Sequence, residues 1–262
     1  MKKRAQLLLF LGFILLVGCQ KEATLSDKQP SPVEGSSFDS PTEAHYQKQF
    51  LQVNNAHQSI IGYKAGLTSK AGQSKFNVNE PIAGVLFEKG LSHHREVYLL
   101  NQHSRLMLET EIGFILSKPV HQEVSLDDVH RYVKSVVPVI ELPDLNYPQL
   151  DKLTGLELIA TNVASNKVLI GHPKALSDIN INTIETHLTK NGITINKGAA
   201  TDALGDQLIA LQWLINRLIK TGYQPQAGEL LITGALGKMV AAEPGQYDAD
   251  FGELGTLAFS IR

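Results

Sequence analysis

The sequence of 262 residues contains one cysteine, Cys19. Without a second cysteine the chain cannot form an internal disulfide, so its fold must be held by a hydrophobic core. An apolar run spans residues 7–17, which is too short for a membrane-spanning helix of ~20 residues. Positive charge is also scarce. After residue 18 the chain has 21 basic and 26 acidic residues, a net charge of −5. This balance argues against nucleic acid as a partner and against a basic membrane-binding surface.

The N-terminus has the layout of a secretion signal. Three basic residues precede the apolar run, which ends in Leu16-Val17-Gly18-Cys19. This ending resembles the lipobox of bacterial lipoproteins, in which the cysteine becomes the lipidated first residue of the mature chain. We expect residues 1–18 to be a lipoprotein signal peptide, with Cys19 lipidated and the chain attached to the cell envelope through its lipid. An uncleaved anchor and an ordinary signal peptide are the alternatives. Gln20 favours an outer membrane, periplasmic side, where the cell has one.

The rest of the chain divides into a linker and a domain. Residues 19–42 are rich in Ser, Pro, Asp, Glu and Lys and nearly free of large apolar side chains. Such a composition predicts a disordered tether. Residues 43–262 are long enough for one domain with a sizeable core.

Hydrophobic periodicity gives a first outline of that domain. Helices are predicted over residues 43–62, 125–136 and 203–220, the second capped by Ser125 and the third ending before Gly222. Strands are predicted over residues 62–69, 84–87, 106–116, 228–234 and 255–261, around Glu141 after Pro138, and at the end of a loop-then-strand segment over 156–170. Strands outnumber helices and do not alternate with them. The pattern favours an α+β fold with a curled, antiparallel or mixed sheet.

Paired carboxylates mark the central strand. Glu109 and Glu111 lie two positions apart in a mostly apolar run, so both side chains point to one face of the strand. Glu141 stands alone between apolar neighbours about thirty residues later. Two like charges on a buried strand repel each other and resist loss of water, and a divalent cation would convert that cost into a binding site. The alternative is that the glutamates line a solvent-exposed face.

Four blocks of sequence stand out over about residues 60–261. The blocks are Ile61-Gly62-Tyr63-Lys64-Ala65-Gly66-Leu67-Thr68-Ser69, Glu109-Thr110-Glu111-Ile112-Gly113 with Glu141, Asn162-Val163-Ala164-Ser165 to Gly171, and Thr233-Gly234-Ala235-Leu236-Gly237-Lys238-Met239-Val240 to Gly255. In their order and spacing they resemble the 2-keto-4-pentenoate hydratase / 4-oxalocrotonate decarboxylase family of the fumarylacetoacetate hydrolase superfamily. The resemblance implies a fumarylacetoacetate hydrolase C-terminal-like fold, a curled mixed sheet with flanking helices.

The resemblance also implies a chemistry. Glu109, Glu111 and Glu141 would hold Mg²⁺ or Mn²⁺, which chelates a 2-hydroxydienoate or 2-oxo acid and stabilises its enolate. Lys64 matches the family's active-site lysine, and a lysine beside a cation is expected to have a lowered pKa. A surface lysine on a strand is the alternative. Thr233 and Gly234 would offer a hydroxyl and a backbone N–H to the substrate, although they could simply end a strand. The family also implies a homo-oligomer.

Departures from the family pattern leave alternatives open. Ile82 stands where the family has an aspartate of the acid–base apparatus, and Thr161 replaces another aspartate. Pro143-Asp144-Leu145-Asn146 lacks the family's Ser-Arg pair. The leading prediction is a metal-dependent hydratase of the aromatic-catabolism type. A catalytically impaired, lipid-anchored binding protein for a small carboxylate or envelope partner is the first alternative, and a purely structural envelope protein is the second.

Other chemistries lack their motifs. No HExxH or Cys/His cluster supports zinc. The segment around Lys238 resembles a phosphate loop only superficially, because Met239 stands where Ser or Thr should bind Mg²⁺. No G-x-S-x-G nucleophile elbow occurs.

Overall fold

A computed structural model describes residues 40–262. The predicted signal peptide, Cys19 and residues 19–39 of the predicted tether lie outside the described residues. Helix α1 spans Pro41–Asn55, so the folded domain begins two residues before the boundary expected at residue 43. Among residues 40–262, no helix has the length and apolarity needed to cross a membrane.

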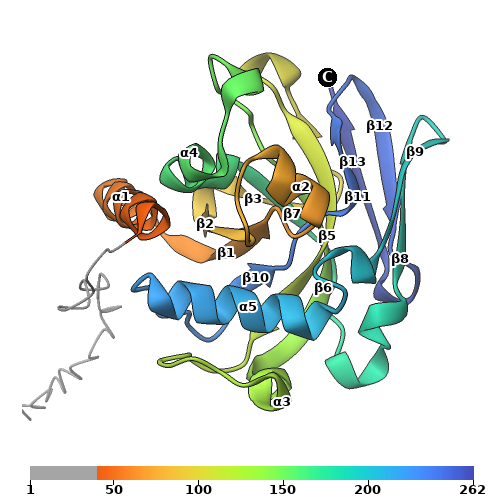
Figure 1. Ribbon diagram of the computed structural model, residues 1–262. Helices are drawn as coiled ribbons and strands as arrows, with labels where there is room; N and C mark the ends of the chain where they lie inside the picture. Colours follow the sequence, from red (N-terminus) through yellow and green to blue (C-terminus); the bar gives the residue numbers. More distant parts are fainter. Residues whose placement is uncertain (1–39) are drawn as a thin grey trace, which may run out of the picture.

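Two sheets make up most of the domain (Figure 1). The larger has the strand order β2-β1-β10-β5-β6-β7-β3, with β11 paired to β5. The smaller has the order β4-β13-β12-β8-β9. The strands of the larger sheet are β1 Ile60–Gly66, β2 Ile82–Phe87, β3 Leu91–His93, β5 Met107–Leu116, β6 Val133–Leu142, β7 Lys167–Ile170, β10 Leu230–Ile232 and β11 Leu236–Ala241. Those of the smaller are β4 Val97–Tyr98, β8 Glu185–Lys190, β9 Ile193–Ala199, β12 Gly245–Asp250 and β13 Thr256–Ile261.

Helices flank the larger sheet. Besides α1 they are α2 Lys70–Lys75, α3 Leu126–Val129, α4 Gly155–Ala160 and α5 Gln207–Lys220. Figure 1 shows α5 running across the lower part of the sheet, with α1 and α4 on one side and the smaller sheet on the other. Most strand pairs are antiparallel, while β1–β10, β3–β7 and β4–β13 are parallel. The α+β class with a mixed, curled sheet is therefore confirmed.

Helix α5 provides the main helical contribution to the core. Asp206 caps its start, because the carboxylate accepts hydrogen bonds from the backbone N–H groups of Leu208 and Ile209. The predicted start at residue 203 was too early, since Leu204 and Gly205 have φ angles of 55° and 81°. One side of the helix is buried against the sheet through Ala210, Leu211, Leu214, Ile215 and Leu218.

Other predicted boundaries were wrong for local reasons. The helix predicted over 125–136 is a single turn capped by Ser125, because the β-branched run that follows forms β6 and includes Pro138. The helix predicted over 43–62 ends at Asn55, and β1 begins at Ile60. The segment around Leu156 is helix α4, held by a capping box between Thr154 and Glu157.

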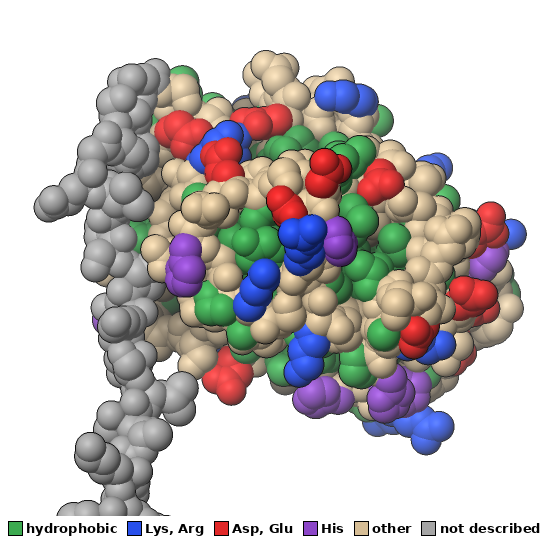
Figure 2. All heavy atoms as spheres, turned by 90° about the horizontal axis from the view of Figure 1, so that it is seen from below, with side chains coloured by type: hydrophobic (Ala, Val, Ile, Leu, Met, Phe, Trp, Pro, Cys, Tyr) green, Lys and Arg blue, Asp and Glu red, His purple; other side chains and the backbone are tan. Residues whose placement is uncertain are grey.

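The surface carries charges of both signs. Figure 2 shows one face on which acidic, basic and hydrophobic side chains are interspersed, with no large area of positive charge. This mixed pattern agrees with the weakly negative charge of the sequence.

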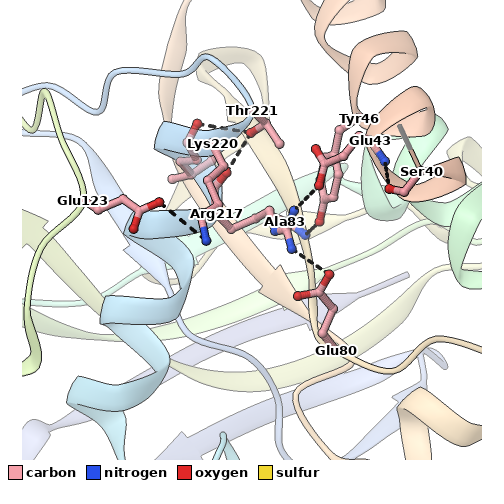
Figure 3. A network of polar contacts seen from close by, with 10 residues as sticks. Ser40, Glu43, Tyr46, Glu80, Ala83, Glu123, Arg217, Lys220 and Thr221 are labelled. Carbon is pink, nitrogen blue, oxygen red and sulfur yellow. Dashed lines mark hydrogen bonds and ion pairs between the residues drawn. The ribbon is translucent and has the colours of Figure 1, made fainter. Parts of the chain in front are cut away.

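A buried arginine ties α5 to the N-terminal part of the domain (Figure 3). The Arg217 guanidinium donates to Glu43 of α1 at 2.8 Å and to Glu80 at 2.6 Å. It also lies over the Tyr46 ring, 5.2 Å from the centroid. Tyr46 in turn accepts a hydrogen bond from the Ala83 N–H of β2. Arg217 therefore fixes α1 and the entry into β2 at one point.

Replacing Arg217 with alanine should lower the free energy of unfolding by about 2 kcal/mol. The change removes two charge-assisted hydrogen bonds and a cation–π contact, but Glu43 and Glu80 are exposed enough to regain water. Lys220→Ala is the matched control, because Lys220 pairs with Glu123 at 3.5 Å on the surface of the same helix. Its loss should cost less than about 0.5 kcal/mol. Urea unfolding compares the two variants, and equal losses would contradict the role of Arg217.

Candidate metal centre

The register of two strands gathers the three glutamates. Strands β5 and β6 pair antiparallel with Glu109 directly opposite Glu141, and Glu111 opposite Val139. Directly opposed side chains point to the same face of a sheet, and Glu111 shares that face because it follows Glu109 by two residues. Carboxylate oxygens from the three residues lie within 4.8 Å of one another. The structure therefore brings together the three residues that the sequence singled out.

The cluster is buried and strongly perturbed. Glu111 and Glu141 have no exposed surface, whereas Glu109 is partly exposed and marks the open side of the cluster. Burial and the Glu141 charge raise the pKa of Glu109 to about 7, against the opposing effect of Lys64. Burial and the two neighbouring carboxylates also raise the pKa of Glu111 well above its ordinary value. The sheet therefore holds like charges together at a cost in free energy.

Two oxygens of the cluster lack a hydrogen-bond partner among the described residues. They are Glu111 Oε1 and Glu141 Oε2. Buried carboxylate oxygens without a donor are costly unless a cation satisfies them. Three carboxylates, two of them with an unpartnered oxygen, match the preference of hard cations for oxygen ligands, and such cations keep coordination positions for water or substrate. The donor set therefore fits Mg²⁺ or Mn²⁺, with Glu109, Glu111 and Glu141 as the residues that would hold the ion.

Lys64 lies beside the cluster. Its ammonium is buried, donates to Glu141 Oε1, and donates to the Val163 carbonyl at 3.1 Å. Burial lowers the pKa of Lys64, but the charges of Glu141, Glu109 and Glu111 outweigh burial and leave the pKa above its ordinary value. The lowered pKa expected from the sequence requires a cation beside Lys64 and stays a prediction; in the metal-free arrangement the charges that face Lys64 are carboxylates, which favour its protonated form. The alternative of a surface lysine is excluded.

A left-handed turn delivers the Val163 carbonyl to Lys64. Asn162, Val163 and Ala164 have φ angles of 59°, 53° and 53°. Such values are costly for a β-branched residue. The Asn162 side chain holds the turn in place, accepting from the Val85 N–H at 2.7 Å and donating to the Val85 carbonyl at 2.9 Å. Asparagine tolerates left-handed backbone, so Asn162 is a sequence signal that could have indicated this turn, but the sequence pattern predicted only a loop here.

Thr233 and Gly234 follow β10 at the edge of the cluster. The Gly234 N–H donates to Glu111 Oε2 at 2.8 Å. Gly234 has a φ of 109°, and a Cβ there would lie 2.5 Å from Thr68 Oγ1, so glycine is required. Thr233 is fully buried, with its hydroxyl 2.6 Å from Gln207 Oε1 and 3.1 Å from the Ile112 carbonyl. That Thr233 and Gly234 contact a substrate stays a prediction. In the structure Gly234 bonds Glu111 directly, and Thr233 bonds the neighbouring Ile112 and Gln207.

Two of the positions at which the sequence departs from the expected family pattern, Ile82 and Thr161, lie on segments around Lys64. In the β1–β2 register Lys64 opposes Gly84 and Gly66 opposes Ile82, so Ile82 is on the Lys64 face. Ile82 is buried and carries no titratable group. Thr161 is bonded through its hydroxyl to Tyr147 at 2.7 Å. Burial raises the pKa of Tyr147 and the Lys64 charge opposes that rise, so Tyr147, which sequence reasoning missed, lies within electrostatic reach of Lys64.

Comparisons with known proteins give the chain a family. A 2-keto-4-pentenoate hydratase from Dechloromonas aromatica is 30% identical over 202 residues, covering 76% of each chain. The chain belongs to the 2-keto-4-pentenoate hydratase family. The structure of 4-oxalocrotonate decarboxylase from Pseudomonas putida G7, complexed with magnesium and adipate, matches with a TM-score of 0.78 and 26% identity, covering 84% of this chain and 86% of that one.

More distant structures extend the fold match to the superfamily. A fumarylacetoacetate hydrolase family protein from Yersinia pestis matches with a TM-score of 0.59 and 15% identity, covering 77% of this chain and 93% of that one. At that identity the likeness concerns the fold alone, which confirms the predicted fold class. The sequence matches no protein-family model.

The glutamate cluster should make the metal-free protein less stable as pH rises. The pKa of Glu109 is about 7 in the folded state against an ordinary 4.5, so the folded protein retains a proton that the unfolded chain releases between these values. The contribution of Glu109 to stability is therefore fully present below pH 4.5 and is lost as pH rises through about 7. Mg²⁺ or Mn²⁺ needs the deprotonated carboxylates, so its addition should raise the melting temperature more at pH 8 than at pH 5.5.

A second carboxyl group with a raised pKa would give the same dependence of stability on pH, so it must be removed from both proteins that are compared. Burial also raises the pKa of Glu229 to about 7, so the comparison is made between Glu229→Gln and the double variant Glu229→Gln/Glu109→Gln. Thermal melts with and without the cation at both pH values give the result. A cation-induced shift that is independent of pH, or unchanged by Glu109→Gln, would show that the cluster does not bind the ion.

Proposed function

We propose that the chain is a divalent-metal-dependent hydratase acting on a 2-hydroxydienoate or the corresponding 2-oxo acid. The observation that supports this most directly is the buried three-carboxylate cluster with two unpartnered oxygens, in contact with a buried lysine. Membership of a family that includes metal-dependent enzymes of this substrate class agrees with the geometry. The proposed class is a carbon–oxygen hydro-lyase with Mg²⁺ or Mn²⁺ as cofactor.

The residues would divide the chemistry among them. Glu109, Glu111 and Glu141 would hold the cation, which supplies positive charge against the 2-oxygen and carboxylate of the substrate. Hydration of 2-hydroxypenta-2,4-dienoate moves the enol proton off oxygen, adds hydrogen at carbons 3 and 5, and adds the water hydroxyl at carbon 4. A cation held by the glutamates would offset the negative charge that keeps Lys64 protonated, so we assign to Lys64, which contacts Glu141, the transfer of the enol proton. Thr233 and Gly234 are proposed to orient the substrate's carboxylate end.

Purified residues 20–262 should consume 2-hydroxypenta-2,4-dienoate only when Mg²⁺ or Mn²⁺ is present. Loss of the dienol absorbance follows the reaction. Glu109→Ala together with Glu111→Ala should abolish it, because two of the three cation ligands are removed. Lys64→Met should lower kcat by at least about 100-fold while preserving cation binding, since general acid–base groups contribute about that much.

Ile82 supports an alternative function in which the protein binds its ligand without hydrating it. Its buried, non-titratable side chain on the Lys64 face supports an impaired relative that binds a small carboxylate, or an envelope partner, without hydrating it. Ile82→Asp separates the two. If the wild-type protein binds the cation but does not hydrate the substrate, and the variant does, the result favours the impaired relative. Failure to bind any divalent cation would instead remove the metal site and leave a structural envelope protein.

We further propose that Cys19 is lipidated and that the segment between Cys19 and the start of α1 tethers the domain to a membrane of the cell envelope. The lipobox-like ending of the apolar run supports this proposal. Full-length protein should partition into Triton X-114 detergent, and Cys19→Ser should shift it to the aqueous phase. Equal partitioning of both proteins would rule out a lipid on this residue. Self-association, implied by the family, remains a prediction.

A further inference from the structure

A tyrosine hydroxyl lies against the left-handed turn at 162–164, which binds Lys64. The Tyr147 phenol oxygen is 2.7 Å from the hydroxyl oxygen of Thr161, the residue that immediately precedes the turn. The Thr161 hydroxyl has a single proton, and it donates that proton to the Glu157 carbonyl of α4 at 2.7 Å. The bond between the two hydroxyls is therefore donated by Tyr147. The phenol proton is directed at the start of the turn.

The far end of the turn contacts the same segment of chain. Burial raises the pKa of Tyr147, and a backbone hydrogen bond from Ala164 is among the contacts that lower it. The Asp144 N–H, three residues before Tyr147, donates to the Ala164 carbonyl at 3.1 Å. The segment that follows β6 therefore holds the turn both where it begins and where it ends.

The segment that carries Tyr147 is itself anchored. The Asp144 carboxylate accepts hydrogen bonds from the Ser104 N–H at 3.1 Å and from the Arg105 N–H at 2.7 Å. The Leu145 N–H donates to the Arg105 carbonyl at 3.0 Å, and the Tyr147 N–H donates to the Leu145 carbonyl at 3.0 Å. Loss of the phenol hydroxyl would therefore release the turn while the segment after β6 stays in place.

These contacts close a ring around the lysine. Strand β6 carries Glu141, which accepts a hydrogen bond from Lys64, and then continues into the segment that holds the turn. The turn presents the Val163 carbonyl, which accepts from the same ammonium at 3.1 Å. Left-handed residues with side chains cost free energy, so the turn needs bonds from outside to keep this conformation. Tyr147 links the two elements that supply the acceptors of Lys64.

We propose that Tyr147 is a positioning residue for Lys64. It holds the turn so that the ammonium stays between the Val163 carbonyl and Glu141. Asn162 ties the turn to β2, whereas Tyr147 ties it to the segment after β6. The inference rests on the proposed function for the step that Lys64 performs, while the placement of Lys64 is tested without turnover.

The first test measures how often the buried Lys64 amine is released in the metal-free protein. Acetylation by sulfo-N-hydroxysuccinimide acetate, followed at each lysine by mass spectrometry, reports such local opening. Tyr147→Phe keeps the ring and removes the hydroxyl. It should raise the acetylation rate of Lys64 about three- to tenfold, as expected for the loss of a hydrogen bond. The rate at Lys134, which is exposed and outside the site, should stay the same.

Tyr247→Phe is the matched control. The Tyr247 hydroxyl also takes part in two hydrogen bonds, donating to the Glu243 carbonyl at 2.6 Å and accepting from the Glu243 N–H at 3.1 Å. It belongs to β12 of the smaller sheet, so its loss should leave the acetylation rate of Lys64 unchanged. An unchanged rate in Tyr147→Phe, or an equal rise in Tyr247→Phe, would overturn the proposal.

The other end of the bond gives an independent pair of variants. Thr161→Ser keeps the hydroxyl that accepts from Tyr147 and should behave like the wild type. Thr161→Val removes that hydroxyl and should raise the acetylation rate of Lys64, as Tyr147→Phe does. Because both changes break the same bond, the double variant should add little to either one. Additive effects of the two changes would contradict a shared role.

Turnover separates this inference from the proposed function. In an active protein Tyr147→Phe should lower kcat about three- to tenfold and leave KM and Mg²⁺ affinity unchanged, because the bonds it removes involve no glutamate of the cluster. An unchanged kcat would overturn the positioning role and leave the hydratase. Faster acetylation of Lys64 in Tyr147→Phe, when the wild type hydrates no dienoate, would sustain the placement of Lys64 and reject the hydratase.

Discussion

The pairing of β5 with β6 is the constraint on which the rest of the site depends. It places Glu109 opposite Glu141 and adds Glu111 on the same face, in a part of the sheet that excludes water. Like charges in such a place favour either proton uptake or a cation. Two neighbouring strands position groups that partly offset the negative charge of the glutamates. Strand β10 leads to the Gly234 N–H, which donates to Glu111, and β1 carries Lys64, which donates to Glu141. The strand order β1-β10-β5-β6 therefore determines the electrostatics of the centre as well as the architecture.

The contacts around Lys64 are held by elements that have little regular structure. The turn at 162–164 keeps three residues with side chains in left-handed conformation, at a cost of roughly 1–3 kcal/mol each. Asn162 secures it by bonding both backbone groups of Val85, and Gly84 leaves room for the Val163 side chain, which a Cβ would approach to 3.1 Å. A relaxed turn would withdraw the carbonyl from Lys64 and leave Glu141 as its partner. The strain thus fixes the direction of the ammonium group between two acceptors.

Sequence patterns predicted the parts of this molecule that depend on local order. The apolar stripe predicted α5, and the i, i+2 spacing placed Glu109 and Glu111 on one face. Glu141 was predicted as the third ligand from its place between apolar neighbours and from the family resemblance. Patterns failed where tertiary contacts override local preference. The capped segment after Ser125 was extended as a helix, because the sheet that accepts Val133–Leu142 as β6 is not visible in a local window. The three carboxylates that raise the pKa of Lys64 in the metal-free arrangement come from two other strands, so no local window around Lys64 indicates them. Tyr147 had no motif to identify it.

The same geometry bears on proton transfer at the site. Ile82 occupies the Lys64 face without a titratable group, and Thr161 uses its hydroxyl to bond Tyr147. Tyr147 has a raised pKa, so its phenol keeps its proton at neutral pH and acts as a hydrogen-bond donor or acceptor rather than as a base. Charge stabilisation by the glutamates and their cation does not need either missing aspartate, because it depends on the β5–β6 register. Proton delivery does need a titratable group or water near the substrate, and among the side chains discussed around the centre Lys64 carries the mobile proton. Under the proposed function, the three glutamates would hold the cation that polarises the enolate, and Lys64 would transfer the protons.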